Sequence, residues 1–211
     1  MTTAAVVLAA GASERMGQPK QLLPWRETTV LGAVIESLRQ AAVEEIVVVL
    51  GCRAEEIRRS LRPVRAGRPV SAGSLMTIVN PDWREGMLSS VQIGLRALKT
   101  GPAAVAVTLG DQPGMPPALI AQLFSEQRKS PGSIVIPSVA AQAGARGRWG
   151  HPVVFDAGYV AEILLLSREA TLREVRERHR DRVVLVACAE AALLDLDTPE
   201  EYAQARGADG S

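Results

Sequence analysis

Residues 6–20 read VVLAAGASERMGQPK, so an apolar run leads into a loop that is bounded by Gly11 and Gly17. Glycine tolerates positive φ and lets the backbone approach an anion, and successive N–H groups in such a turn form an anion-binding concavity. The loop also carries Arg15, a planar fork for phosphate oxygens, and Lys20, a compact point charge. This stretch predicts a buried strand that delivers a polyphosphate-binding loop.

Two other phosphate-binding loops do not fit these residues. Five residues separate Gly11 from Gly17 and Gln18 follows, whereas a P-loop needs G-x-x-x-x-G-K-[ST]. Ser13 stands where the dinucleotide fingerprint G-x-G-x-x-G needs its second glycine. For the glycines and the lysine taken alone, an ordinary loop between a strand and a helix is the alternative.

The bulk properties favour one α/β domain. A chain of 211 residues with 47% hydrophobic residues can bury a sizeable core, which we place in residues 1–206, ahead of a disordered tail at 207–211. A net charge of +1 gives no global field that would attract nucleic acid. Cys52 and Cys188 lie far apart and only 2 histidines occur, which argues against a zinc site or a disulfide framework.

The sequence also favours the cytoplasm. Met1 leads directly into an apolar strand without a basic leader, so no signal peptide is expected. No apolar run reaches the roughly 18 residues of a membrane helix. We therefore expect a cytoplasmic protein without a membrane partner.

Short apolar runs alternate with longer amphipathic runs along the chain. The expected strands are 4–10, 46–50, 75–79, 103–109, 133–137, 152–155, 183–187 and 193–196; the expected helices are 29–42, 54–61, 88–98, 117–128, 157–166, 171–179 and 199–205. This alternation predicts a three-layer α/β/α architecture with a mostly parallel, Rossmann-like sheet. Residues 62–73 are expected as an exposed excursion, and 139–150 as a lid or a plain surface loop.

A second turn with a candidate functional side chain follows a later apolar run. Residues 105–109 lead into Gly110-Asp111-Gln112-Pro113, which sets a carboxylate at the carboxyl end of a strand. Ligands of such sheets bind beyond these strand ends, so Asp111 would face the glycine loop. A carboxylate that faces a triphosphate is most simply a Mg²⁺ ligand, because Mg²⁺ takes one or two protein carboxylates with waters and phosphate oxygens. A turn-initiating aspartate is the alternative.

The string L-A-A-G-x-S-x-R-M-G-x-P-K, followed by QLLPW at 21–25, resembles the signature of the MobA-like NTP transferases, the nucleotidyltransferases of molybdenum-cofactor synthesis. It looks most like the molybdenum cofactor cytidylyltransferase (MocA-like) branch. Further motifs extend the resemblance over nearly the whole chain: N-P-x-W at 80–83, G-M-x-S-S at 86–90, G-D-Q-P at 110–113, G-H-P at 150–152 and LDLDTPEEY at 194–202. One departure is SREATLR at 167–173, where these relatives carry a G-D-x-G-A-R-like segment, and it puts the identity of the acceptor in question.

The resemblance implies the nucleotide-diphospho-sugar transferase type of fold and a role for particular residues. The implied nucleotide-binding residues are Leu8, Ala9, Ala10, Gly11, Ser13, Arg15, Gly17, Lys20, Asn80, Ser89 and Ser90. It implies a metal ligand at Asp111 and an acceptor site near His151, for which a hydrogen-bonded structural histidine is the alternative. Arg148 and Arg146 precede His151 and are candidates for holding an anionic acceptor, with a solvated basic loop as the alternative. Asp197 is the candidate second metal ligand and Asp195 the next; a structural role is the alternative for both.

Thr198 and Glu201 are spaced as a capping box, with Pro199 at the first helical position, which leaves Asp197 free. Ser89 and Ser90 are open to a similar alternative as simple helix caps.

The implied reaction is Mg²⁺-dependent nucleotidyl transfer, in which an acceptor phosphate attacks the α-phosphorus of a nucleoside triphosphate and pyrophosphate leaves. Arg15 would hold the β- and γ-phosphates, Lys20 would stabilise the α-phosphate, and Asp111 with Asp197 would hold Mg²⁺. L-A-A-G rather than L-A-G-G favours CTP, with molybdopterin as acceptor.

Four alternatives stay open. Two keep the chemistry: a guanylyltransferase, or a sugar- or polyol-phosphate nucleotidyltransferase. The third is a non-catalytic protein that delivers molybdenum cofactor to a molybdenum hydroxylase. The fourth is an oxidoreductase on the same scaffold, against which the missing dinucleotide fingerprint argues.

Overall fold

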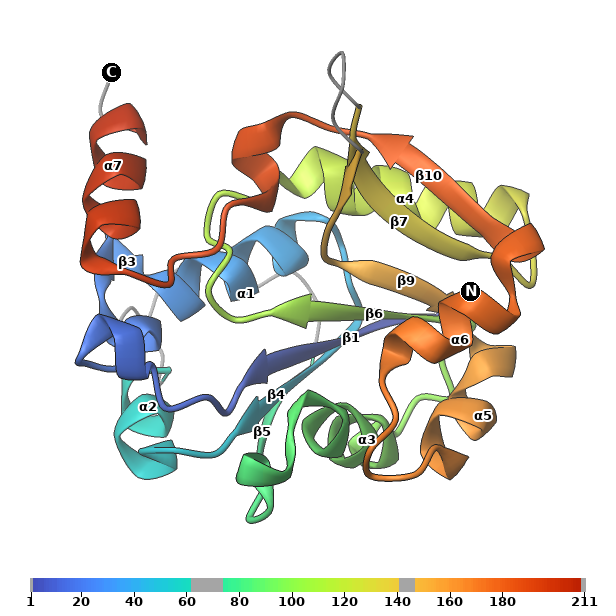
Figure 1. Cartoon of the computed structure of the whole chain (residues 1–211), viewed down its shortest axis with the longest axis horizontal. Coiled ribbons are helices and arrows are strands. Elements are labelled where there is room, and N and C mark those ends of the chain that lie inside the picture. Colours follow the sequence, from blue (N-terminus) through green and yellow to red (C-terminus); the bar gives the residue numbers. More distant parts are fainter. Residues whose placement is uncertain (1, 62–73, 141–146, 210–211) are drawn as a thin grey trace.

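The computed structural model describes residues 2–61, 74–140 and 147–209, and an eight-stranded sheet forms its centre (Figure 1). The strand order is β10-β7-β9-β6-β1-β4-β5, and β8 pairs with β7 beside this path. The strands of this sheet are β1 Thr3–Ala9, β4 Glu45–Leu50, β5 Ser74–Val79, β6 Ala104–Leu109, β7 Ile134–Val139, β8 Arg148–Trp149, β9 Val153–Asp156 and β10 Val183–Ala187. A separate hairpin consists of β2 Pro24–Trp25 and β3 Thr28–Thr29.

Most strand pairs of the sheet are parallel. Strands β5, β4, β1 and β6 pair in parallel, as do β10 and β7, whereas β9 runs antiparallel to both β6 and β7. Strand β4 reads EIVVVL and is buried at every position, as a parallel strand covered on both faces should be. The expectation of a mostly parallel α/β fold is confirmed.

Helices cover both faces of the sheet and complete three layers (Figure 1). The helices are α1 Val30–Gln40, α2 Ala54–Ser60, α3 Met87–Ala97, α4 Pro117–Lys129, α5 Val160–Leu165, α6 Leu172–Arg178 and α7 Pro199–Asp209. Helices α1 and α4 share one core with Ala5 and Val7 of β1, and α3, α5 and α6 share the other core with Val6. Successive side chains of a strand point to opposite faces, which is why one strand supplies both cores.

Helix α3 lies unusually close to the sheet at Gly94. A Cβ atom there would stand 2.4 Å from Cγ1 of Val6 and 2.9 Å from Cγ2 of Val49. Only a glycine therefore lets the helix approach β1 and β4 at this point.

The C-terminal end differs from expectation in two ways. Residues 193–196 form no strand: Glu190–Leu193 is a 3-10 turn, and Leu196 donates its N–H to the carbonyl of Asp111 at 3.2 Å. The alternating Leu-Asp-Leu-Asp pattern at 194–197 is typical of a strand. In the structure, however, Leu193 and Leu196 are buried in two different clusters. Helix α7 continues to Asp209, so residues 207–209 of the expected tail are helical.

Other expectations concern loops. Within the expected loop at 139–150, Val139 closes β7, and β8 pairs with it and with Ser138. Residues 62–73, 141–146 and 210–211 lie outside the described residues, so those parts of the expected loops and tail stay untested. In the described part of the chain, no helix combines the length and the apolar character needed to cross a bilayer.

Candidate functional site

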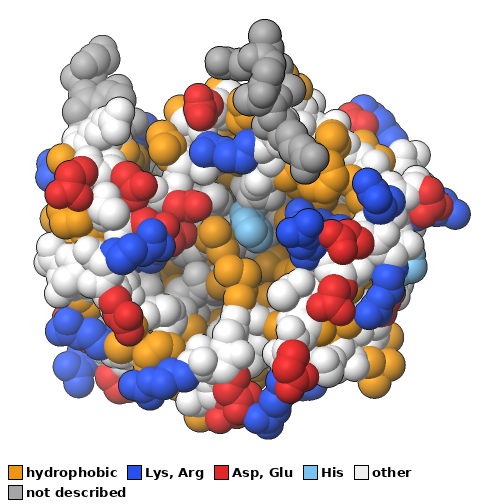
Figure 2. All heavy atoms as spheres, viewed as in Figure 1, with side chains coloured by type: hydrophobic (Ala, Val, Ile, Leu, Met, Phe, Trp, Pro, Cys, Tyr) orange, Lys and Arg blue, Asp and Glu red, His pale blue; other side chains and the backbone are white. Residues whose placement is uncertain are grey.

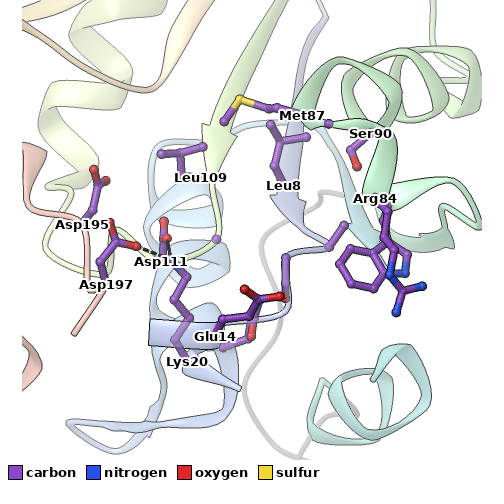
Figure 3. Close-up of a pocket in the computed structure, with 16 residues that line it drawn as sticks. Leu8, Glu14, Lys20, Arg84, Met87, Ser90, Leu109, Asp111, Asp195 and Asp197 are labelled. Atoms are coloured by element: carbon purple, nitrogen blue, oxygen red, sulfur yellow. Dashed lines mark hydrogen bonds and ion pairs between the residues drawn. The ribbon is translucent and has the colours of Figure 1, made fainter. Parts of the chain in front are cut away.

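A pocket of about 720 Å³ opens where β1 and β6 end (Figure 3). Five parts of the chain form its wall: the β1 end with the glycine loop, the turn around Lys20, the start of α3, the turn after β6 and the segment before α7. The lining residues are Leu8, Ala10, Gly11, Glu14, Lys20, Gln21, Trp83, Arg84, Gly86, Met87, Ser90, Leu109, Gly110, Asp111, Asp195 and Asp197. The pocket thus lies where a parallel sheet places its ligands.

The glycine loop forms a tight turn with one unexpected feature. Met16 and Gly17 both donate their N–H groups to the carbonyl of Ser13 at 3.1 Å. Gly17 has φ +70°, as expected, but the other left-handed residue is Ser13 at φ 56° and not Gly11. Gly11 does not use the positive φ that glycine tolerates; no atom lies within 4 Å of a Cβ built there, so the backbone is left open to the pocket.

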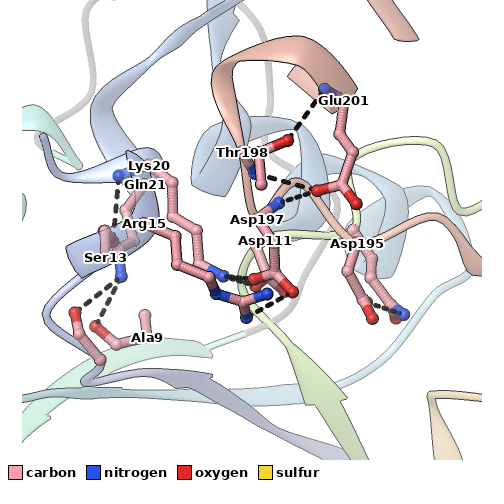
Figure 4. A network of polar contacts seen from close by, with 12 residues as sticks. Ala9, Ser13, Arg15, Lys20, Gln21, Asp111, Asp195, Asp197, Thr198 and Glu201 are labelled. Carbon is pink, nitrogen blue, oxygen red and sulfur yellow. Dashed lines mark hydrogen bonds and ion pairs between the residues drawn. The ribbon is translucent and has the colours of Figure 1, made fainter. Parts of the chain in front are cut away.

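Gln21 fixes the shape of this loop through its side-chain amide (Figure 4). Its buried amide donates to the carbonyls of Ala9 and Gly11, both at 3.4 Å, and accepts from Ser13 Oγ at 3.4 Å. Ser13 Oγ also accepts from the N–H of Lys20 at 3.2 Å. The hydroxyl of Ser13 and the amide of Gln21 thus hold the loop around the pocket mouth.

Lys20 joins the two carboxylates that the sequence singles out (Figure 4). Its Nζ forms ion pairs with Asp111 and, at 2.9 Å, with Oδ1 of Asp197. Burial alone would lower the pKa of Lys20, but the attraction of the Asp111 and Asp197 carboxylates outweighs it and raises the pKa. Arg15 donates to Oδ2 of Asp197 at 2.8 Å while 70% of its side chain stays exposed. Two cations and two carboxylates therefore meet in one place.

The titration of the neighbouring carboxylates follows from this arrangement. Burial would raise the pKa of Asp197, but Lys20 and Arg15 outweigh it and lower the pKa. For Asp195, burial and then the charge of Asp111 raise the pKa, although its Oδ1 accepts from Gln112 at 2.7 Å. Asp197 is thus the more strongly ionised of the two C-terminal candidates.

The carboxylates of Asp111 and Asp197 suit a divalent metal ion. The Oδ1 atom of Asp111 is buried without a hydrogen-bond partner, which is a costly state that a bound cation would relieve. Mg²⁺ is commonly bound by only one or two carboxylates with phosphate oxygens and waters. Among the described residues no group of three metal-binding side chains occurs, so the donor set suits a metal that arrives with a phosphorylated ligand.

Asp197 is positioned by the start of α7. Glu201 accepts the N–H groups of Asp197 and Thr198, both at 2.9 Å, and the N–H of Glu201 donates to Thr198 Oγ1 at 3.2 Å. The expected capping box is confirmed, and it leaves the Asp197 carboxylate directed at Lys20.

The other expected nucleotide-binding residues divide between the pocket and its frame. Leu8, Ala10, Gly11, Lys20 and Ser90 line the pocket; Ala9, Ser13, Arg15, Gly17, Asn80 and Ser89 do not. Asn80 donates to Ser89 Oγ at 2.9 Å and to Ser90 Oγ at 3.0 Å, which ties the start of α3 to the end of β5. Asn80 is buried, so the structure places it in the frame of the site.

The opposite wall of the pocket includes Trp83, Arg84 and Met87, none of which was predicted as a site residue. The Arg84 guanidinium lies 4.3 Å from the Trp83 ring centroid, and the side chain of Met87 is 53% exposed (Figure 3). A Cβ on Gly51 would stand 2.7 Å from the Trp83 side chain, so a close contact with the end of β4 holds this tryptophan. The N-P-x-W and G-M-x-S-S pattern was the available signal for this wall.

The acceptor candidates lie outside the pocket lining. Arg148 donates to the carbonyls of Leu193 at 3.4 Å and Glu190 at 3.5 Å, which holds the C-terminal segment. His151 is partly buried, and burial together with the charge of Arg176 lowers its pKa to about 4, so it is neutral at pH 7. Arg146 lies outside the described residues.

The sequence is similar to a known protein family and to several characterised proteins. Residues 5–183 match the family model described as MobA-like NTP transferase domain. The chain is 34% identical over 202 residues to the Nicotine blue oxidoreductase of Paenarthrobacter nicotinovorans. The aligned region covers 93% of this chain and 92% of the relative. It is 26% identical over 201 residues to the Molybdenum cofactor cytidylyltransferase of Escherichia coli strain K12, with 95% and 94% covered.

A solved structure agrees over the whole chain. A protein of Mycobacterium tuberculosis H37Rv has a TM-score of 0.78 at 26% identity and covers 98% of both chains. A second structure of that protein, in complex with manganese, has a TM-score of 0.73 at 25% identity and covers 98% of this chain and 99% of that one.

Proposed function

The chain belongs to the MobA-like NTP transferase family, and on this premise we propose that it is a Mg²⁺-dependent nucleotidyltransferase that transfers CMP from CTP to a molybdopterin-type acceptor. The observation that carries the proposal is the meeting of Lys20, Asp111 and Asp197 at the carboxyl ends of β1 and β6. Phosphoryl chemistry depends mostly on positioning and on neutralising charge, and these residues supply both signs of charge at one point.

The residues divide the work as follows. Asp111 and Asp197 would hold Mg²⁺, which when bound would neutralise negative charge on phosphate oxygens. Lys20, the ammonium nearest both carboxylates, stabilises the charge that grows at the α-phosphate. Arg15, whose side chain is mostly exposed, holds the departing pyrophosphate. The attacking acceptor phosphate is already ionised, so no side chain has to act as general base.

The choice of CTP rests on the L-A-A-G sequence of the β1 end and on the relative from Escherichia coli. In the pocket, Leu8 and Met87 offer apolar surface for a base, and Ser90 offers a hydroxyl beside them. We place the cytosine against these three residues, opposite the carboxylates.

The test is pyrophosphate release with Mg²⁺ and molybdenum cofactor, using CTP, GTP, ATP and UTP in parallel. We expect release with CTP and its loss in Asp111→Ala. The control Asp181→Ala removes an exposed carboxylate of the 3-10 turn Arg180–Arg182 and should keep the activity. Release with GTP alone would keep the chemistry and reject the base assignment. Mg²⁺-dependent CTP binding without turnover would favour a different acceptor or a delivery role toward a molybdenum hydroxylase.

A second candidate function is an oxidoreductase, and the similarity to the Nicotine blue oxidoreductase favours it. Against it stands the loop of 11–17, which lacks the glycine pattern of a dinucleotide site. The discriminating measurement is the absorbance spectrum of the purified protein, together with consumption of reduced nicotinamide in the presence of nicotine blue. Such turnover, if Asp111→Ala retained it, would replace the nucleotidyltransferase proposal.

A further inference from the structure

A second pocket, of about 730 Å³, lies beside α6 and shares no lining residue with the first. Its lining residues are Gly147, Trp149, Arg173, Arg176, Glu177, Arg180, Val183 and Leu185. Over α6 and β10, basic side chains stand beside exposed hydrophobic ones (Figure 2). This pocket therefore combines positive charge with apolar surface.

Arg176 is the unusual residue of this pocket. The carboxylates of α6 are held by other arginines: Glu177 by Arg173 at 2.7 Å, and Glu174 by Arg178 at 3.6 Å. Among the described residues no carboxylate pairs with Arg176, although its side chain is half-buried. Burial and the charge of Arg173 lower its pKa, and the charge of the neighbouring Glu177 only partly offsets them. A partly desolvated guanidinium without an ion-pair partner is costly, and it is a good partner for an incoming anion.

Trp149 supplies a flat apolar surface next to this cation. Its side chain is 47% exposed, and the Arg176 guanidinium lies 5.6 Å from its ring centroid. Leu185 of the edge strand β10 is 46% exposed and lines the same pocket. An aromatic ligand could bury both of these surfaces while its charge meets Arg176.

We propose that the Arg176–Trp149 pocket binds an anionic ligand with a planar aromatic ring, the ring against Trp149 and the anionic group on Arg176. The guanidinium favours a phosphate or carboxylate because it presents paired donors.

If the proposed function holds, this ligand is the acceptor of the reaction. The role as acceptor rests on the proposed function, whereas the binding of the ligand rests on the pocket alone. Two interactions in space connect this pocket with the segment that carries Asp195 and Asp197. The Arg176 charge acts on His151, and a Cβ on the adjoining Gly150 would stand 2.6 Å from Leu193, which precedes Asp195 and Asp197.

The experiment is isothermal titration calorimetry with 1-naphthyl phosphate as probe, compared with inorganic phosphate and 1-naphthol. We expect the naphthyl phosphate to bind most tightly, because it alone carries both ring and charge. Arg176→Gln should weaken its binding about tenfold, the loss of one charge-assisted hydrogen bond, and Trp149→Ala about fivefold. The matched control Arg178→Gln removes the same charge from the same helix, where the arginine pairs with Glu162 and Glu174, and should leave binding unchanged.

Absence of binding to the wild-type protein would overturn the proposal, as would equal binding to Arg176→Gln. Melting curves of each variant establish that it is folded. A parallel titration with CTP and Mg²⁺ separates the two proposals. If CTP does not bind but the naphthyl phosphate does, the proposed function fails and this pocket stands. If Arg176→Gln weakens CTP as much as the probe, the pocket is part of the nucleotide site and the inference is wrong.

Discussion

At the scale of the residue, Lys20 links the stability of the fold to the proposed chemistry. Its ammonium neutralises Asp111 and Asp197, and only 15% of the side chain is exposed. A nearly isosteric Lys20→Met variant leaves two neighbouring carboxylates without this cation. We expect nucleotidyl transfer to fall by about 10²–10³-fold, since the group acts on developing charge.

The same variant should lose about 1–3 kcal/mol in free energy of unfolding, the usual range for a lost hydrogen bond to a charged group. Millimolar Mg²⁺ should stabilise it more than the wild type, because the ion no longer competes with the ammonium for the carboxylates. Urea unfolding with and without Mg²⁺ checks this. Lys129→Met, at an exposed pair with Glu126, is the control; an equal response to Mg²⁺ in all three proteins would contradict the expectation.

At the scale of elements, the contact between α6 and the β8–β9 connection makes stability depend on pH. Burial and Arg176 lower the pKa of His151 from 6.5 to about 4 in the folded protein. Between these values the unfolded chain binds the proton and the folded chain does not. The stabilisation is therefore complete above about pH 6.5 and is lost as the pH falls toward 4, with a total of about 3 kcal/mol.

Urea unfolding at pH 7.5 and pH 5 measures this effect. His151→Gln should remove most of the difference between the two pH values. His179→Gln is the matched control because His179, the residue after α6, pairs with Glu162 and not with Arg176, and it should leave the difference in place. A wild-type protein equally stable at both pH values would refute the argument.

The sequence predicts best those elements whose own composition or local spacing is sufficient to identify them. The apolar runs of β1, β4 and β6 are buried on both faces, so their composition alone indicates parallel strands. Local chemistry likewise predicts the capping box of Thr198 and Glu201. By contrast, the expected strand at 193–196 has a strand-like pattern, and only the burial of Leu193 and Leu196 in two separate clusters decides against it.

In the candidate site, too, some residues could be predicted from the sequence and others depend on tertiary contacts. Lys20 and Asp111 each follow a recognisable strand end, so their meeting is predictable from the order of elements. The roles of Gln21 and Trp83 depend on what their side chains touch, the carbonyls of the loop and Gly51 respectively. The left-handed backbone at Ser13 is likewise a property of the closed turn, and the residue pattern of the loop does not predict it.

At the scale of the whole molecule, the two ends of the chain build the site together. Arg15 and Asp197 are 182 residues apart and form an ion pair. Beneath them, Leu196 is 1% exposed and packs in one cluster with Met16 and Trp25 from the glycine-loop region. The Asp197 carboxylate and the loop therefore rest on a shared apolar support, and loosening that support should affect both.

Leu196→Ala tests this dependence. Removing a fully buried leucine should cost about 2–4 kcal/mol in free energy of unfolding. Hydrogen exchange should then accelerate both in the 11–25 segment and in the 194–206 segment, because both pack on Leu196, while β4 stays protected. Leu165→Ala, at a leucine that is 85% exposed, should change stability by less than about 0.5 kcal/mol and alter neither segment. Faster exchange confined to 194–206 would mean that the C-terminal segment is held independently of the loop, and Asp197 would then be positioned by its capping box and its ion pairs alone.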